Sequence, residues 1–168
     1  AVGGLIGDLD FTKVADLNIS GAKALTISAL TSLAALATID STGAGVTITP
    51  TLQTGQTFTG GDGVEKIQVS AQTTAIALGA GDDQLTMTGA AFGTGGTADG
   101  GDGTDTLVMT AASAVTASAS ATFEAKISNF EKLTIGNVAA TGTVAMNNLD
   151  DIAAVTVAGV AAGKVLTI

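Results

Sequence analysis

The chain has 168 residues and a formal net charge of −9, with 15 acidic residues, 6 lysines and no arginine, histidine or cysteine. Because it has no basic patch to displace counterions from phosphates and no run of about 20 apolar residues to span a bilayer, we expect neither nucleic-acid binding nor membrane insertion. The lack of histidine and cysteine removes the usual general base and the thiol nucleophile, so we predict that the chain is not an enzyme.

Residues 1–56 contain alternating apolar triplets at 25–27 and 46–48, each bounded by glycine, and these triplets predict short strands. An apolar pattern with a looser spacing occurs twice. If its two copies belong to successive coils, Leu36 of the second copy should stack on Leu17 of the first. The two copies are Phe11, Val14, Leu17 and Ile19, then Leu30, Leu33 and Leu36. A short helical turn over 28–38 is an alternative, since Ala and Leu dominate that stretch. Pro50 lacks an N–H group and is predicted to mark a corner or the start of a new coil face.

Three turns rich in glycine and aspartate, at 60–65, 79–83 and 100–105, lie in the block 57–109. Apolar residues recur every nine positions through the first part of this block. They are Phe58, Ile67, Ile76 and Leu85. Such a period predicts the half-coil of a parallel β-solenoid, in which a turn of about six residues precedes a strand of about three with an inward apolar centre.

The spacing of the three turns predicts how they stack. The first two are separated by two of the nine-position periods, which make one full coil, so they should lie directly against each other. The third follows after a longer interval, so we expect 88–98 to bulge out as a loop. The stretch 70–75 carries no glycine and aspartate motif and should form the opposite edge of the coil.

After this block, 110–122 is a low-complexity run of Ala, Ser and Thr that could form either a surface strand or a loop. Another apolar pattern then occurs twice. If its two copies belong to successive coils, Val155 of the second copy should stack on Leu133 of the first. The copies are Ile127, Phe130, Leu133 and Ile135, then Leu149, Ile152, Val155 and Val157. Predicted strand centres recur at half the distance in sequence between these two copies. They are Leu133, Val144, Val155 and Leu166. The flanks therefore share the plan of the central block with longer coils.

These periods predict an all-β fold, a right-handed parallel β-solenoid (β-roll or β-helix) with coils of about 18–22 residues. We expect N-terminal coils at 1–56, glycine-rich coils at 57–109 and C-terminal coils at 110–168. They should form one continuous solenoid that is a segment of a longer chain. A β-sandwich of short strands is the alternative, and the strict periods in the central block and the C-terminal flank disfavour it.

The stretch 100–108, Gly-Gly-Asp-Gly-Thr-Asp-Thr-Leu-Val, resembles the nonapeptide of RTX-type calcium-binding β-rolls at every specified position. The other two copies depart from it, with Glu65 in the aspartate place and Leu78 in the first glycine place. The resemblance implies Ca2+ ions held between consecutive turns by carbonyls and carboxylates of both. The implied ligands are Gly61, Asp62, Gly63, Glu65, Gly79, Gly81, Asp82, Asp83, Asp99, Gly101, Asp102, Gly103 and Asp105. Plain turns without metal are the alternative.

The order of segments over 57–135 is similar to that of bacterial surface-layer proteins with RTX-like repeats. Glycine-rich units are followed by an Ala/Ser/Thr-rich stretch and then by Ile-Ser-Asn-Phe-Glu-Lys-Leu-Thr-Ile at 127–135. This resemblance implies secretion, a place on the bacterial cell surface, and a lattice or filament of identical subunits cemented by calcium. A cell-surface polysaccharide is a further candidate partner. The alternative is a module of a large RTX adhesin or the accessory β-roll of a secreted exoenzyme.

Overall fold

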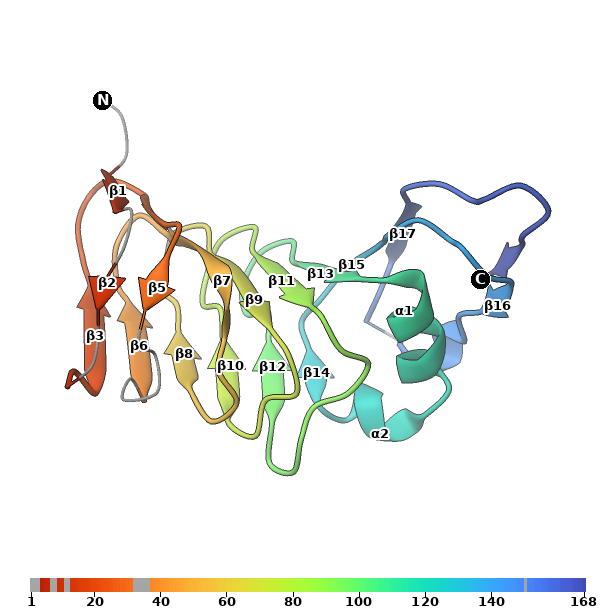
Figure 1. Cartoon of the computed structure of the whole chain (residues 1–168), viewed down its shortest axis with the longest axis horizontal. Helices are drawn as coiled ribbons and strands as arrows, with labels where there is room; N and C mark the ends of the chain where they lie inside the picture. The colour runs from red at the N-terminus through yellow and green to blue at the C-terminus, as the bar shows by residue number, and fades with distance from the viewer. Residues whose placement is uncertain (1–3, 7–8, 11–12, 32–36, 150) are drawn as a thin grey trace.

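The computed structural model describes residues 4–6, 9–10, 13–31, 37–149 and 151–168. They form the predicted parallel β-solenoid, with about seven turns and only about 10% helix. Figure 1 shows the coils stacked side by side from the N-terminal to the C-terminal end. Neighbouring strands pair in parallel, as the stacking of successive coils requires.

Two sheets form the main walls of the coil. The larger sheet has eight strands. In spatial order these are β1 (Gly4–Ile6), β4 (Leu25–Ile27), β7 (Val46–Leu52), β9 (Lys66–Val69), β11 (Gln84–Met87), β13 (Thr106–Met109), β15 (Lys132–Ile135) and β17 (Ala154–Val157). The smaller sheet has six strands. They are β14 (Ile127–Ser128), β12 (Thr97–Asp99), β10 (Ala75–Ala77), β8 (Thr57–Thr59), β6 (Thr38–Ser41) and β3 (Asp16–Ile19).

Two short strand pairs lie outside these sheets. They are β2 (Leu9–Asp10) with β5 (Leu30–Thr31), and β16 (Gly142–Thr143) with β18 (Leu166–Thr167). The 3-10 turn η2 (Met146–Asn148) follows β16.

The register between coils confirms the nine-position period. Phe58 pairs with Ile76 in the smaller sheet, and Ile67 pairs with Leu85 in the larger one. Leu85 in turn pairs with Leu107. These five side chains are at most 2% exposed. Inward positions of successive strands therefore stack into one continuous apolar core.

The third of the glycine-rich coils bulges where the sequence predicts a loop. β11 ends at Met87 and β12 begins at Thr97, so 88–96 lies outside both sheets. The predicted loop over 88–98 extends too far, because Thr97 and Ala98 belong to β12. The Phe92 ring of this loop stacks on the Phe123 ring, with 6.1 Å between centroids. The loop is therefore packed against the next coil.

Two expectations for the N-terminal coils are wrong. Leu17 pairs with Ile39 and not with Leu36, because each coil must return its strand to the same place in the sheet and the apolar spacing underestimates the coil length. Pro50 lies inside β7 and not at a corner. The register of β7 with β9 shifts between Thr47 and Thr51, and a residue without an N–H group is tolerated at such an irregularity.

The helical alternative over 28–38 is contradicted at both of its ends. β5 occupies Leu30–Thr31 and β6 begins at Thr38. Residues 32–36, which include Leu33 and Leu36 of the second apolar copy, lie outside the described residues, as does Phe11 of the first.

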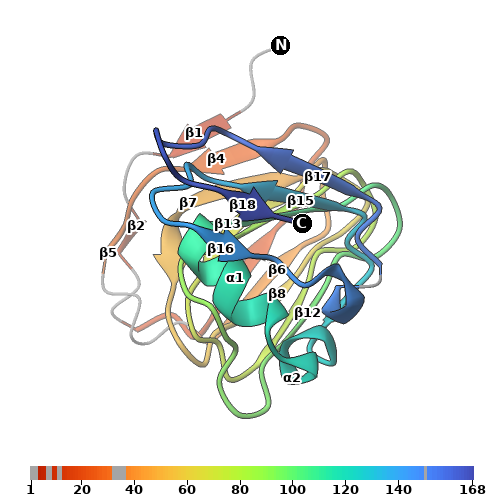
Figure 2. The same ribbon diagram turned by 90° about the vertical axis from the view of Figure 1, so that its right-hand side faces the viewer.

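The run 110–122, predicted as a strand or a loop, instead forms helix α1 (Ala111–Ser118) and the start of α2 (Ala121–Glu124). Thr110 caps α1 by accepting a hydrogen bond from the Ser113 N–H group, and alanine is the best helix former. Figure 1 shows α2 beside β14, and Figure 2 shows α1 across the C-terminal end of the coil, next to β16. No described helix is long and apolar enough to cross a bilayer.

In the C-terminal coils, one of the two predicted periods is confirmed and the other is wrong. Leu133 pairs with Val155, which confirms the displacement between the two apolar copies. Leu166, however, pairs with Gly142 and not with Val144, so the half-interval repeat does not hold for the last strand. Val144 is buried at the end of β16, which packs against α1.

Candidate metal centre

The glycine-rich turns stack on one edge of the coil, just before strands of the larger sheet. The Ala80 N–H group donates to the Gly61 carbonyl at 2.7 Å, and the Asp102 N–H group donates to the Gly79 carbonyl at 2.9 Å. Turns that are consecutive in the sequence are therefore neighbours in space, as predicted. We call this stack the glycine edge.

Glycine is required on this edge for conformation and for space. Gly101 and Gly103 have φ values of 96° and 142°, in a region that residues with a Cβ rarely adopt. A Cβ on either residue would lie 1.8 Å from a carbonyl oxygen of the preceding turn, Gly79 O or Gly81 O respectively. The carbonyls of one turn therefore lie directly against the next turn.

Three acidic side chains point inward at the glycine edge. Glu65, Asp83 and Asp105 are each at most 1% exposed. Each directly precedes β9, β11 or β13. Because side chains alternate along a strand, each acid shares the inward face with the core residue two positions on, such as Leu85 after Asp83. The sheet register stacks these three acids, which we call the carboxylate column.

One oxygen of each column carboxylate makes a contact with the coil before it. Asp83 Oδ1 accepts from the Glu65 N–H group at 2.8 Å, and Asp105 Oδ1 accepts from the Asp83 N–H group at 2.7 Å. The Ser41 hydroxyl donates to Glu65 Oε1 at 3.4 Å. Charge-assisted bonds from backbone N–H groups favour the ionised carboxylate.

The second oxygen of each column carboxylate has no partner. Glu65 Oε2, Asp83 Oδ2 and Asp105 Oδ2 are buried and accept no hydrogen bond. A buried polar atom without a partner costs about 1–3 kcal/mol, and more when it is charged. Three such oxygens in successive coils indicate that a positive species, a cation or a proton, completes the column.

Burial makes the ionised column unfavourable by itself. It raises the pKa of the Glu65 carboxyl to about 8, with a further contribution from the Asp83 charge. It raises the pKa of Asp83 to about 6, and the Asp105 charge adds to this shift. The pKa of Asp105 is raised for the same reason. A bound cation would reverse these shifts by favouring the carboxylates.

The structure does not bring all of the predicted carboxylates together. Four predicted acids, Asp62, Asp82, Asp99 and Asp102, are exposed on the outside of the turns. Asp82 Oδ1 accepts from the Thr104 N–H group at 3.0 Å. Within the described ranges, no group of three or more acidic side chains converges closely enough to hold a metal ion. A cation between two turns would therefore be held mainly by backbone carbonyls, with column carboxylates supplying the charge.

The available donors fit Ca2+. This ion takes about six to eight oxygen ligands at about 2.3–2.6 Å, from carboxylates, carbonyls and water. Carbonyl oxygens of four predicted glycines lie against the turn that follows. They belong to Gly61, Gly63, Gly79 and Gly81. The unpartnered carboxylate oxygens lie at the same edge and are also hard donors.

The opposite edge, at 70–74, offers no comparable site. Gln72 is fully buried there, but its amide is neutral and both of its polar ends have partners. Its Nε2 donates to the Leu52 carbonyl at 3.1 Å, and its Oε1 accepts from the Gly55 N–H group at 3.3 Å. Sequence reasoning predicted the lack of a motif on this edge but not the amide that fills it.

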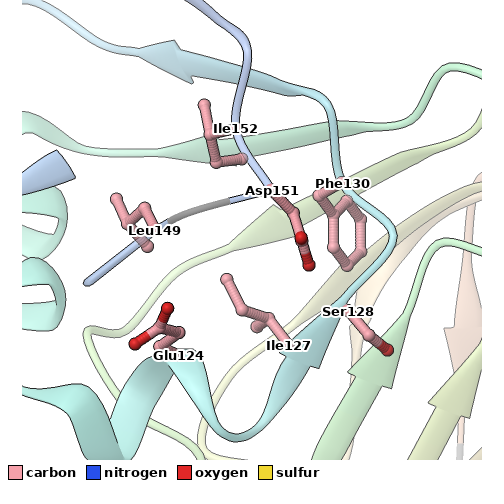
Figure 3. Close-up of a pocket in the computed structure, with 7 residues that line it drawn as sticks. All are labelled: Glu124, Ile127, Ser128, Phe130, Leu149, Asp151 and Ile152. Carbon is pink, nitrogen blue, oxygen red and sulfur yellow. The ribbon is translucent and has the colours of Figure 1, made fainter. Parts of the chain in front are cut away.

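A small cavity lies away from the glycine edge, between α2 and the segment before β17. Figure 3 shows Phe130, Leu149 and Ile152 around it, with the carboxylates of Glu124 and Asp151 nearby. Its volume is about 10 Å³, which is room for about one water molecule. This cavity is too small for a substrate or an organic cofactor.

Sequence reasoning missed one acid at the glycine edge. Glu131 Oε2 accepts from the Asp105 N–H group at 2.7 Å, as Asp105 does from Asp83. Glu131 follows a helical insertion and lies in no glycine motif, so its only signal in the sequence is its place two positions before the strand centre Leu133.

The comparisons with known proteins add no relative to this description. No protein-family model matches the chain, and no curated protein matches it. A functional proposal therefore rests on the residues of the glycine edge and on their geometry.

Proposed function

We propose that this chain is a structural calcium-binding segment of a secreted, self-assembling bacterial surface-layer protein, in which Ca2+ ions clamp consecutive coils. The carboxylate column carries the calcium part of the proposal. Its acids are buried beside a stack of glycine turns, and one oxygen of each has no partner. Ca2+ would neutralise the column and satisfy those oxygens at once.

Two ions follow from the stacking of three turns. The first would lie between 60–65 and 79–83, and the second between 79–83 and 100–105. Each would take carbonyls of the earlier turn and carboxylates from the column, with water completing the shell. The exposed acids outside the turns add negative potential, which raises the local concentration of cations.

The surface-layer part of the proposal is supported by the motif order over 57–135 and by the architecture. A parallel solenoid is a quasi-one-dimensional element whose coils bury their backbone hydrogen bonds against their neighbours. Ions that join coils would add stiffness to the support that the continuous apolar core gives. The proposed partner is a further copy of the same protein, on the bacterial cell surface, with cell-surface polysaccharide as a second partner.

Calorimetric titration of the metal-free chain with Ca2+ tests the ion-binding part. In Asp83→Asn the side-chain oxygen can still accept from the Glu65 N–H group, but the charge is lost. We expect calcium affinity at least about tenfold weaker, since one carboxylate ligand is worth about 1.4 kcal/mol or more. Asp151→Asn, at an exposed acid away from the column, is the matched control and should bind as the parent does.

Either of two results of this titration would contradict calcium binding by the column. A parent chain that takes up no Ca2+ at millimolar concentration, or that binds it equally well after Asp83→Asn, would show that the column is satisfied by protons and not by an ion.

A module of an adhesin is the second candidate, and one surface feature favours it. A groove of about 180 Å³ on the outer face of the larger sheet is lined in part by Thr47, Lys66, Gln68, Gln84 and Thr86. Hydroxyl, amide and ammonium groups of this kind are suited to hydrogen bonding with a glycan. Electron microscopy of the calcium-loaded protein separates the two. Sheets or filaments support a surface layer, whereas monomers that bind a glycan array support the adhesin.

A further inference from the structure

We propose that the carboxylate column extends one coil further, to Glu131, and that Glu131 and Asn129 complete an additional Ca2+ site against the turn 100–105. This inference rests on the proposed calcium binding and adds a site that the glycine motifs do not mark.

The sheet register gives Glu131 the same place in its coil as Asp105. Lys132 is paired with Thr106, and Thr106 is paired with Gln84. The residues that precede these strand positions are Glu131, Asp105 and Asp83. Four successive coils, counting that of Glu65, therefore present an acid at one position.

The hydrogen bond of Glu131 repeats the contact seen along the column. The Asp105 N–H group donates to Glu131 Oε2 at 2.7 Å. The two earlier contacts, from the Glu65 and Asp83 N–H groups to the following acids, measure 2.8 Å and 2.7 Å. Glu131 thus approaches the turn 100–105 from the C-terminal side, as Asp105 approaches the turn 79–83.

A carbonyl and an unpartnered carboxylate oxygen converge beside Gly100. A Cβ built on Gly100 would lie 1.9 Å from Asn129 O and 2.8 Å from Asp105 Oδ2. Asp105 Oδ2 is buried and accepts no hydrogen bond. Both oxygens therefore border the space that a side chain at residue 100 would take. Glycine at that position lets the Asn129 carbonyl and the Asp105 carboxylate come close together, because a Cβ there would collide with both.

Asn129 is held in the conformation that directs its carbonyl to this place. Its φ is 56°, the left-handed region in which asparagine is among the more common non-glycine residues. Its Nδ2 donates to Asp99 Oδ1 at 2.7 Å, and the Gly100 N–H group donates to the Ser128 carbonyl at 2.9 Å. The segment before β15 therefore forms a turn that stacks on the glycine edge without a glycine motif.

The charged side chains that border this place are acidic. Glu131 Oε2 accepts from the Asp105 N–H group, and Asp99 Oδ1 accepts from Asn129 Nδ2, so three acids lie around this place. The Lys126 ammonium is directed elsewhere, to the Gly93 carbonyl at 2.6 Å, and Lys132 is exposed. The groups that border this place, Asn129 O, Asp105 Oδ2 and the Glu131 carboxylate, are oxygen donors, so the site fits a hard divalent cation and not a soft metal.

The test compares calcium stoichiometry in the full chain and in Glu131→Gln. Glutamine can still accept from the Asp105 N–H group, so a purely structural contact would survive the change. We expect the variant to lose one bound Ca2+ per chain, or to bind one ion at least tenfold more weakly. Glu124→Gln, on α2, is the charge-matched control and should keep the parent stoichiometry.

Two results overturn the inference in different ways. A parent chain that binds no Ca2+ removes the proposed function itself. A parent that binds Ca2+ with a stoichiometry unchanged by Glu131→Gln leaves the proposed function intact and refutes only this site. If the variant does not fold, anomalous diffraction from calcium-loaded parent crystals decides. A peak between Asn129 O and Asp105 supports the site, and peaks confined to the earlier turns refute it.

Discussion

Asp83 lies in the middle of the carboxylate column and is subject to opposing effects. Its bond from the Glu65 N–H group favours the ionised form, whereas burial and the neighbouring Asp105 charge favour the protonated one. Burial is the larger effect, so the pKa of the Asp83 carboxyl is raised to about 6. The column therefore couples folding to whichever positive species occupies it.

The first prediction concerns pH. In metal-free protein we expect the free energy of unfolding to fall as the pH rises from about 4 to about 8. The pKa of Glu65 rises on folding from 4.5 to about 8, and that of Asp83 from 3.8 to about 6, so the folded chain binds more protons across this window. This stabilisation is complete below the unfolded values and is lost as pH passes the folded ones.

Thermal unfolding of metal-free protein at pH 5 and pH 8, followed by circular dichroism, measures this slope. A higher melting temperature at pH 8 would contradict the prediction. Saturating Ca2+ should abolish the slope, because the ion replaces the protons.

The second prediction concerns a single glycine. In Gly101→Ala we expect a loss of more than about 2 kcal/mol, because the residue has positive φ and its Cβ would clash with the Gly79 carbonyl. Gly89→Ala is the control, since no atom lies within 4 Å of its Cβ position. Chemical denaturation of both variants compares the two losses. Equal losses would mean that the close approach of the turns is not a constraint.

At the scale of elements, the loop at 88–96 and the helix pair form a unit that the strand periods do not describe. The rings of Phe92 and Phe123 stack across this unit. The Lys126 ammonium, which follows α2, donates to the Gly93 carbonyl at 2.6 Å and to the Phe92 carbonyl at 3.4 Å. The Lys126 ammonium and the ring contact thus join the loop to the helical segment.

The third prediction tests this joint. Lys126→Met keeps an apolar stem but removes the ammonium, so we expect amide exchange in 88–96 to become faster by roughly tenfold, given a loss of about 1.5 kcal/mol or more for charge-assisted bonds. Hydrogen exchange with mass spectrometry gives the rates. Lys164→Met, at an exposed lysine, should leave the loop unchanged. Unaltered exchange in the Lys126 variant would show that the ammonium does not hold the loop, which the ring contact and the bond from the Gly93 N–H group to the Gln72 carbonyl would then keep in place.

At the scale of the whole molecule, each coil is stabilised by the coils on either side of it. The larger sheet passes through the glycine-rich coils from β7 to β15 without interruption. A disturbance in the carboxylate column should therefore spread to neighbouring coils, since a repeat of this kind does not fold alone.

The fourth prediction follows from that dependence. Removing Ca2+ at neutral pH should loosen the coils over 60–108, because unneutralised acids in adjacent coils repel by about 1–4 kcal/mol per pair. We expect a lower melting temperature, and a loss of exchange protection in β9, β11 and β13 that exceeds the loss in β3 and β6. Unchanged melting and unchanged protection after chelation would contradict it.

The spacing of residues by itself determined the parallel solenoid and its glycine edge. A period of nine with inward apolar centres has few other solutions, and turns separated by two such periods must stack when each coil has that length. The predicted pairing of Phe58 with Ile76 and of Ile67 with Leu85 follows directly from this count.

Only the tertiary structure decided which acids are buried. A glycine and aspartate motif shows that a turn forms, but the direction of each side chain depends on where the following strand enters the sheet. Asp83 points inward and Asp82 outward for this reason.

The packing of one coil on the next likewise decided which acids align in the carboxylate column. The helices α1 and α2 lengthen the coil between Asp105 and Glu131, so the sequence spacing does not show that these two residues align. The alignment is seen only from the pairing of β13 with β15. The same packing leaves one oxygen of each column acid without a partner. Hydrogen bonding between coils is set by three-dimensional register, which a one-dimensional period does not specify.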